Sequence, residues 1–248
     1  MTQGATVNKG AAIVVGVGAE SGLGAALARR FAREGLCVTI AGRTPERLRV
    51  VAEQIAATGG AVAIKPADAT SEADVAGLFE EADRDGDLKL VAYNVGSNFA
   101  ASAHDTTPEL FERLWRQNAL GGFTVGREAT LRFAERGQGT ILFTGATASL
   151  RARPPFLAFA AAKAALRAVA QGLAREFGSK GVHVAHIVVD SVIAGEYAAT
   201  TFAEYARSKG ADGVLAVDDI ADAYWALHCQ KRSAWTHEMD LRPFKEPF

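Results

Sequence analysis

A glycine-rich turn between an apolar run and a helical run constrains the fold of this chain more than any other feature. The apolar run Ala11–Val17 is followed by Gly18-Ala19-Glu20-Ser21-Gly22-Leu23-Gly24, and this turn leads directly into a helical pattern over Leu23–Glu34. Without Cβ atoms, glycines let the backbone turn tightly and approach a phosphate, which the free amide groups and dipole of a helix N-terminus attract. The pattern predicts a dinucleotide site; the alternative is a tight turn without a ligand. The predicted binding residues are Gly18, Glu20, Ser21, Gly22, Leu23 and Gly24.

Short apolar runs alternate with longer helical patterns along the rest of the chain, which is typical of a parallel sheet with crossover helices. Further strands are predicted over 37–41, 61–65, 88–93, 140–144, 182–189 and 239–241. Further helices are predicted over 45–57, 72–84, 108–135, 156–177 and 217–229. The fold class is therefore α/β, a doubly wound parallel sheet of about seven strands with helices on both faces. We expect one dinucleotide-binding domain over residues 1–248, with a mobile helical flap over 191–213 that hinges at Gly195, Gly210 and Gly213.

Composition excludes several functional classes. The formal net charge of -1, with Lys and Arg spread along the chain, favours neither a nucleic-acid surface nor an anionic membrane. Residues 1–10 are polar and are not predicted to form a secretory signal. No run approaches the roughly 20 apolar residues of a membrane span. Cys37 and Cys229 are interpreted as buried reduced thiols, which fits a cytoplasmic location. The histidines do not cluster with other ligands at metal-binding spacing, so we predict no metal.

The turn and four later positions resemble the short-chain dehydrogenase/reductase family. The spacing Gly18-xxx-Gly22-x-Gly24 is similar to the family pattern and differs from the general dinucleotide fingerprint. The resemblance implies that Asp68, with Ala69, binds the adenine and that Asn94-Val95-Gly96 and Ile193 contact the cofactor. It implies catalytic roles for Asn118 and Lys163, and it implies that Lys163 also binds the cofactor at the nicotinamide ribose. Taken singly, these residues have structural alternatives: a helix cap for Asp68, a turn residue for Asn94, and polar helix positions for Asn118 and Lys163.

The residues after the second predicted strand bear on which cofactor binds. An acidic side chain there would accept hydrogen bonds from the ribose of NAD, but this chain has Ala41-Gly42-Arg43. A guanidinium can pair with the 2′-phosphate of NADP. Glu20 in the glycine turn opposes that choice, because its carboxylate would repel a phosphate. NADP is favoured, with NAD as the less favoured alternative.

Two positions depart from the family's catalytic pattern. In the family a Tyr protonates the developing alkoxide and a Ser hydrogen-bonds the carbonyl; here the corresponding residues are Phe159 and Ala146. Loss of a positioned general acid costs roughly 10²- to 10⁴-fold in rate, and loss of an oxyanion donor a similar amount. A water held by Asn118 and Lys163 is one possible replacement donor. The other candidates are Tyr197, Tyr205, Thr147, Ser149, Asp190 and Ser191.

The predicted function is an NAD(P)(H)-dependent oxidoreductase that acts slowly or atypically on a carbonyl or alcohol. The alternative is an inactive NADP-binding pseudoenzyme with a regulatory or scaffolding role, which the joint loss of Tyr and Ser favours. Phe99, Phe159 and Phe202 are predicted to face the cleft, so an apolar or aromatic small-molecule substrate is expected. The apolar faces of the predicted helices 108–135 and 156–177, together with the resemblance, imply a homodimer or homotetramer.

Overall fold

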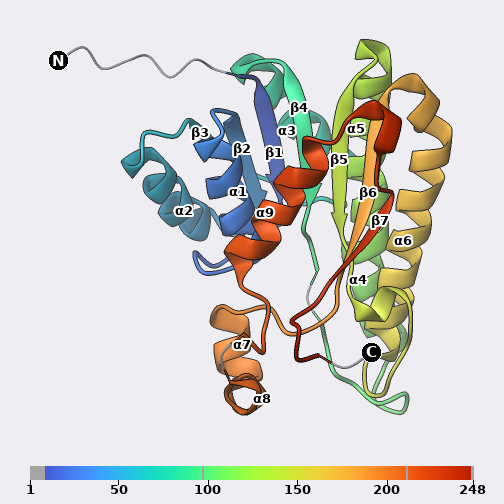
Figure 1. Cartoon of the computed structure of the whole chain (residues 1–248). Coiled ribbons are helices and arrows are strands. Elements are labelled where there is room, and N and C mark those ends of the chain that lie inside the picture. Colours follow the sequence, from blue (N-terminus) through green and yellow to red (C-terminus); the bar gives the residue numbers. More distant parts are fainter. Residues whose placement is uncertain (1–8, 97, 211, 247–248) are drawn as a thin grey trace.

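One parallel sheet organises the computed structural model, which describes residues 9–96, 98–210 and 212–246. Within these residues seven strands are arranged in the order β3-β2-β1-β4-β5-β6-β7 (Figure 1). They are β1 (Ala11–Val15), β2 (Cys37–Gly42), β3 (Val62–Pro66), β4 (Leu88–Tyr93), β5 (Gly139–Thr144), β6 (Val182–Val189) and β7 (Glu238–Leu241). All neighbouring strands pair in parallel. The predicted α/β fold class is confirmed.

Helices cover both faces of the sheet and enclose two cores. One face carries α1 (Leu23–Arg33), α2 (Pro45–Ala57) and α9 (Val217–His228). The other carries α3 (Glu72–Asp85), α5 (Gly121–Arg136) and α6 (Leu157–Phe177). The central strands β1 and β6 are fully buried along their length, because apolar side chains on both of their faces meet a helix layer. The edge strand β3 is only partly buried.

The strand order reverses between β1 and β4, and this switch point marks the edge of the sheet where a ligand is expected to bind. Val15 at the end of β1 lies beside Ala41 of β2 and Tyr93 of β4. The segments that follow these strands begin at Gly16 and Asn94, so they diverge from neighbouring points at the same edge. In open α/β sheets ligands bind in the crevice beyond such a switch point.

The predicted single helix over 108–135 has an interruption that the sequence pattern does not indicate. The structure has α4 (Pro108–Trp115), a π-helical turn η1 (Arg116–Leu120) and then α5. Tyr93 donates a hydrogen bond of 2.6 Å to the Gln117 carbonyl within η1. Asn118 lies in the middle of this turn and is completely buried. Wide helical turns of this kind occur frequently at functional sites.

The predicted flap contains two short helices, α7 (Glu196–Thr201) and α8 (Ala203–Lys209), beyond the carboxyl ends of the strands (Figure 1). Its start is attached to the glycine turn, because the Glu196 amide donates to Ser21 Oγ at 3.0 Å. Tyr197 donates to the backbone carbonyl of Asn98 at 3.1 Å, which joins the flap to the segment after β4. The helical character is confirmed. Hinge motion at the flap glycines stays a prediction, and position 211 of the flap lies outside the described residues.

Two expectations from composition need correction. Cys37 and Cys229 are free, but Cys37 is half-buried and Cys229 is exposed, because Cys229 ends α9 where the helix leaves the core. A segment long and apolar enough to span a membrane exists at Leu157–Lys180, although none was expected. Its helix α6 packs Leu166, Ala170 and Leu173 into the core on one face of the sheet, so a core helix meets the same criteria of length and composition.

Large apolar side chains remain exposed on α4 and α5. They are Phe111, Trp115, Phe123 and Leu131. Exposed apolar surface of this kind is typical of association sites. The homodimer or homotetramer stays a prediction.

Candidate functional site

Two cavities meet at the carboxyl edge of the sheet. The first has a volume of about 730 Å³ and lies beyond β2, β1 and β4; the second, of about 800 Å³, extends toward β5, α6 and the flap. They share a boundary at the switch point. The residues that line both are Gly16, Gly18, Arg47, Asn94, Val95 and Gly96. The predicted cofactor residues on β1 and β4 therefore stand between two connected spaces.

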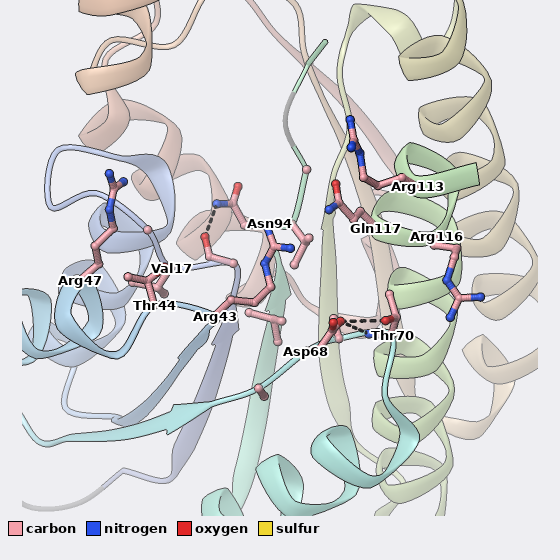
Figure 2. A pocket seen from close by; sticks show the side chains of 18 of the residues that line it. Val17, Arg43, Thr44, Arg47, Asp68, Thr70, Asn94, Arg113, Arg116 and Gln117 are labelled. Carbon is pink, nitrogen blue, oxygen red and sulfur yellow. Dashed lines mark hydrogen bonds between the residues drawn. The ribbon is translucent and has the colours of Figure 1, made fainter. Parts of the chain in front are cut away.

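The first cavity is lined by polar and charged residues, among them Arg43, Arg47, Arg113 and Arg116 (Figure 2). Asp68 Oδ1 accepts hydrogen bonds from the Thr70 amide at 2.9 Å and the Thr70 hydroxyl at 2.8 Å. The Thr70 amide, the Thr70 hydroxyl and the positive charge of Arg43 lower the pKa of the Asp68 carboxyl, so it is ionised at neutral pH. Ala69 also lines this cavity. The predicted trio of Arg43, Asp68 and Ala69 is thus brought together at one ligand-sized space.

The opposite wall of the first cavity comes from α4 and η1, which the sequence interpretation missed. Figure 2 shows Arg113, Arg116 and Gln117 across the cavity from Arg43 and Arg47. Arg113 and Arg116 follow helical i,i+3 spacing and therefore share a face, which was the available sequence signal. The approach of that face to the cavity depends on how the helix packs across the sheet. Glu109 and Glu112 of α4 line this wall as well, so it carries charges of both signs.

Close backbone packing shapes the glycine turn. A Cβ at Gly24 would lie 2.6 Å from the Gly16 carbonyl oxygen, so only glycine lets α1 begin this close to β1. A Cβ at Gly18 would meet nothing within 4 Å, which leaves the turn accessible from the cavity side. Asn94 Nδ2 donates to the Gly16 carbonyl at 3.3 Å and ties the two strand ends together. These features form a cradle suited to a pyrophosphate.

Leu23, Gly22 and Ile193 line the second cavity, but two predicted binding residues line neither cavity: Glu20 and Ser21. The Glu20 carboxylate instead accepts a 2.6 Å hydrogen bond from Gln54 on α2. Ser21 Oγ holds the start of the flap, as described above. Both side chains are therefore engaged with other parts of the protein, Glu20 with α2 and Ser21 with the flap.

Lys163 and Asn118 meet beside Gly96. Lys163 is 4% exposed, and its Nζ donates to the Thr144 carbonyl at 2.8 Å. Asn118 Nδ2 donates to the Leu114 carbonyl at 2.9 Å, while its Oδ1 has no partner among the described residues. A Cβ at Gly96 would lie 2.3 Å from Asn118 Oδ1 and 3.1 Å from Lys163 Nζ, so glycine is required there. Burial lowers the pKa of Lys163 from 10.5 to about 7, because the ammonium loses its hydration.

Phe159 and Ala146, which are predicted to stand at the Tyr and Ser positions, both line the second cavity. Phe159 is 9% exposed, and Lys163 Nζ lies 5.9 Å from its ring centroid. Ala146 lines the same cavity, and its backbone amide donates to Ser149 Oγ at 3.1 Å. Phe202 also lines this cavity. The prediction for Phe99 is wrong: its side chain is 46% exposed and does not line the cavity, because the segment after β4 carries it outward.

The candidate replacement donors separate into two groups. Tyr197, Tyr205, Thr147 and Ser191 line the second cavity, whereas Ser149 and Asp190 do not. Asp190 is 5% exposed and forms a buried network in which Thr147 donates to one carboxylate oxygen, and Arg242 and Arg151 bind the other. Thr147 is therefore engaged with Asp190. No group of three or more potential metal ligands occurs among the described residues.

Comparison with known proteins extends this picture. A family model for short chain dehydrogenase matches residues 12–194. A glucose 1-dehydrogenase of Gluconobacter oxydans is 30% identical over 183 residues, covering 73% of this chain and 69% of that protein. A solved short-chain dehydrogenase from Rhodopseudomonas palustris has a TM-score of 0.81 and 36% identity, covering 95% and 99% of the two chains.

A metagenomic short-chain oxidoreductase, solved in complex with NADP, has the same fold. Its TM-score is 0.79 at 24% identity, with 96% of this chain and 99% of that chain covered. The match of the family model covers the glycine turn, both cavity walls on β1 and β4, and the segment that holds Ala146, Phe159 and Lys163. The sheet order, the two connected cavities and this match together identify the chain as a member of the short-chain dehydrogenase family.

Proposed function

We propose that this protein is an NADP(H)-dependent oxidoreductase that interconverts a carbonyl compound and its alcohol. The observation that carries the proposal is the continuity of the two cavities across the switch point. One cavity offers a basic, hydrogen-bonding pocket suited to an adenosine phosphate, and the other holds a buried lysine beside an apolar wall. A dinucleotide with two unlike ends matches such a pair of spaces. When bound, the nicotinamide of the cofactor supplies or accepts the hydride.

The residues of the first cavity favour NADP over NAD. Arg43 lines the cavity and forms no ion pair with any residue in the described part of the chain, so its guanidinium is available to a phosphate. On the opposite wall Arg113 and Arg116 lie beside Glu109 and Glu112, so the preference for a phosphate rests on Arg43 and Arg47. Asp68, ionised and oriented by Thr70, is suited to accept hydrogen bonds from the adenine amino group. The metagenomic relative in complex with NADP supports the same choice.

We assign the proton transfer to Lys163. It is the ionisable side chain that stands next to the Phe159 ring, where the family has its Tyr. Only one of the three ammonium hydrogens is used within the described protein, on the Thr144 carbonyl. In carbonyl reduction the ammonium donates a proton to the developing alkoxide and becomes a neutral amine, which solvent reprotonates. Asn118 Oδ1, an unsatisfied buried acceptor, orients the ammonium or a water between the two side chains.

The turnover number is expected to be small. Without the Tyr and Ser hydroxyls, the substrate oxygen loses two positioned hydrogen-bond donors. Lys163 supplies a proton in place of the missing tyrosine, but the Thr144 carbonyl competes with the substrate oxygen for its ammonium hydrogens. An activity detectable with enzyme in high concentration, and well below that of relatives with both hydroxyls, follows from this arrangement.

The test begins with fluorescence titration of the purified protein with NADPH and NADH, followed by NADPH oxidation over a panel of aryl and alkyl ketones. Ketone-dependent oxidation that Lys163→Met removes, measured at saturating NADPH, supports the proposal. Binding of NADPH without oxidation of any ketone overturns the enzymatic part and supports a cofactor-binding pseudoenzyme. An absence of NADPH binding overturns the cofactor assignment itself.

A further inference from the structure

The second cavity carries positive charge beyond that of Lys163. Its charged lining residues are Arg47, Arg151, Arg153, Lys163 and Glu196. Arg47 and Glu196 form an ion pair of 3.2 Å and neutralise one another. The remaining lining charges are all cationic, so an anion in this space would be attracted electrostatically.

Arg151 is joined to the reaction centre through the buried network around Asp190. Its Nη2 lies 3.4 Å from Asp190 Oδ2, and the same oxygen binds Arg242 at closer range. Thr147, the neighbour of Ala146, donates to the other Asp190 oxygen. Because Arg242 and Thr147 already satisfy this carboxylate, the distant contact to Arg151 leaves most of that guanidinium's donors unused. Arg151 lines the second cavity together with Ala146 and Thr147.

Arg153 is the stronger candidate for an anion ligand. It lines the cavity, is exposed, and has no ion pair or side-chain hydrogen bond with any residue between 9 and 246 that the structure describes. Its backbone carbonyl accepts a 2.8 Å hydrogen bond from the Phe156 amide, which anchors the segment that carries it. Phe156 and Phe159 line the same space. Cationic and aromatic surfaces thus share one wall of the cavity.

We propose that the second cavity binds a carbonyl substrate bearing a carboxylate, an apolar oxo acid or the corresponding hydroxy acid, with Arg153 and Arg151 as its carboxylate ligands. The proposal rests on the proposed function and names its substrate class. A planar guanidinium pairs with a carboxylate through two parallel hydrogen bonds, which gives orientation as well as attraction. The aromatic wall accommodates the rest of the substrate. The ring at Phe159 and the carboxylate site would together position the carbonyl beside Lys163.

The test compares matched ligands that differ in charge. Benzoylformate and its methyl ester serve as substrates with NADPH, while phenylacetate and phenylacetamide serve as unreactive ligands measured by calorimetry in the presence of NADP. We expect the acids to bind about tenfold more tightly than their neutral counterparts. Arg153→Gln should remove most of that preference, and Arg151→Gln part of it. Arg175→Gln, at an exposed site on the far end of α6, is the matched control and should leave it intact.

The two arms separate failure of this proposal from failure of the proposed function. Tighter binding of phenylacetate that depends on Arg153, without turnover of any carbonyl, would establish the anion site and overturn the oxidoreductase. Turnover of the ester as efficient as that of the acid, together with equal affinities for phenylacetate and phenylacetamide, would overturn the carboxylate site and leave the oxidoreductase standing. A preference for the acid that survives in both arginine variants would also overturn it.

Discussion

Restoring the family's hydroxyls offers the most direct test of whether this site is arranged for hydride transfer. Phe159→Tyr adds a hydroxyl to a ring that lines the second cavity and is only 9% exposed, so the surrounding side chains fix the direction of the new group. Ala146→Ser adds a second hydroxyl at a position whose backbone is already anchored by Ser149. Neither substitution removes an existing polar contact.

The expected gain follows from the chemistry of the two groups. Lys163 Nζ lies 5.9 Å from the Phe159 ring centroid, and a nearby ammonium favours the phenolate and lowers the pKa of a phenol. A positioned general acid contributes roughly 10²- to 10⁴-fold, which corresponds to about 3–5 kcal/mol of activation free energy. An additional oxyanion donor contributes about 10²-fold or more. Phe159→Tyr should therefore raise kcat at least about 100-fold, and the double variant further.

Single-turnover oxidation of NADPH with saturating ketone measures this gain, and fluorescence titration checks that NADPH affinity is unchanged. Phe202→Tyr is the matched control, because it adds a hydroxyl to another phenylalanine of the same cavity, on the flap and not on α6. The reasoning would be refuted by a double variant that binds NADPH normally and turns over no faster than the parent. That outcome would mean that the site no longer brings hydride and carbonyl together.

Three further predictions follow from the same geometry. The pKa of Lys163 is about 7 and its ammonium is the acid in reduction, so kcat for ketone reduction should fall as the pH rises above about 7. The kcat for alcohol oxidation should rise over the same range. Flat pH profiles of kcat in both directions would exclude Lys163 as the proton donor. Arg43→Gln should weaken NADPH binding by roughly tenfold or more and leave NADH binding nearly unchanged. Arg49→Gln, at an exposed position on α2, should leave the binding of both cofactors unchanged. Equal losses of NADPH and NADH affinity in Arg43→Gln would contradict a phosphate contact. Gly96→Ala should lower the free energy of unfolding by more than the roughly 1 kcal/mol expected for Gly59→Ala. Both glycines have positive φ, but only a Cβ at position 96 would contact Asn118. Equal decreases in the melting temperature of the two variants would show that the contact with Asn118 has no effect on stability.

Lys163 also links stability to pH. The unfolded chain keeps this lysine protonated up to its ordinary pKa of 10.5, whereas the folded chain releases the proton near 7. The unfolded state therefore binds more protons between these values, and this group's contribution makes the folded state more stable as the pH rises through that window. Urea denaturation at pH 7 and pH 9 of the parent and of Lys163→Met measures this contribution, which the methionine variant should lack.

Sequence pattern alone determined the strand-turn-helix site, the α/β class and most element positions, because the period of apolar residues and the glycine spacing are local properties. The resemblance to the family, and not the pattern alone, predicted roles for Lys163, Asn118 and Asp68 and predicted that Phe159 and Ala146 occupy the Tyr and Ser positions. The π-helical turn at Asn118 was not predictable, because it depends on packing between the helix and β4, including the bond from Tyr93 to Gln117.

Tertiary structure decided the directions of side chains and the partners across elements. Glu20 turns to Gln54, Phe99 turns to solvent, and Ser21 holds the flap, although all three sit in or beside binding motifs. Arg113 and Arg116 of the first cavity and Arg151 and Arg153 of the second come from segments that reach the site only after the chain has crossed the sheet. Local sequence specifies which elements form and which residues lie at their ends, whereas cavities and their charge arise from contacts between residues far apart in the chain, which the packing of helices on the sheet alone brings together.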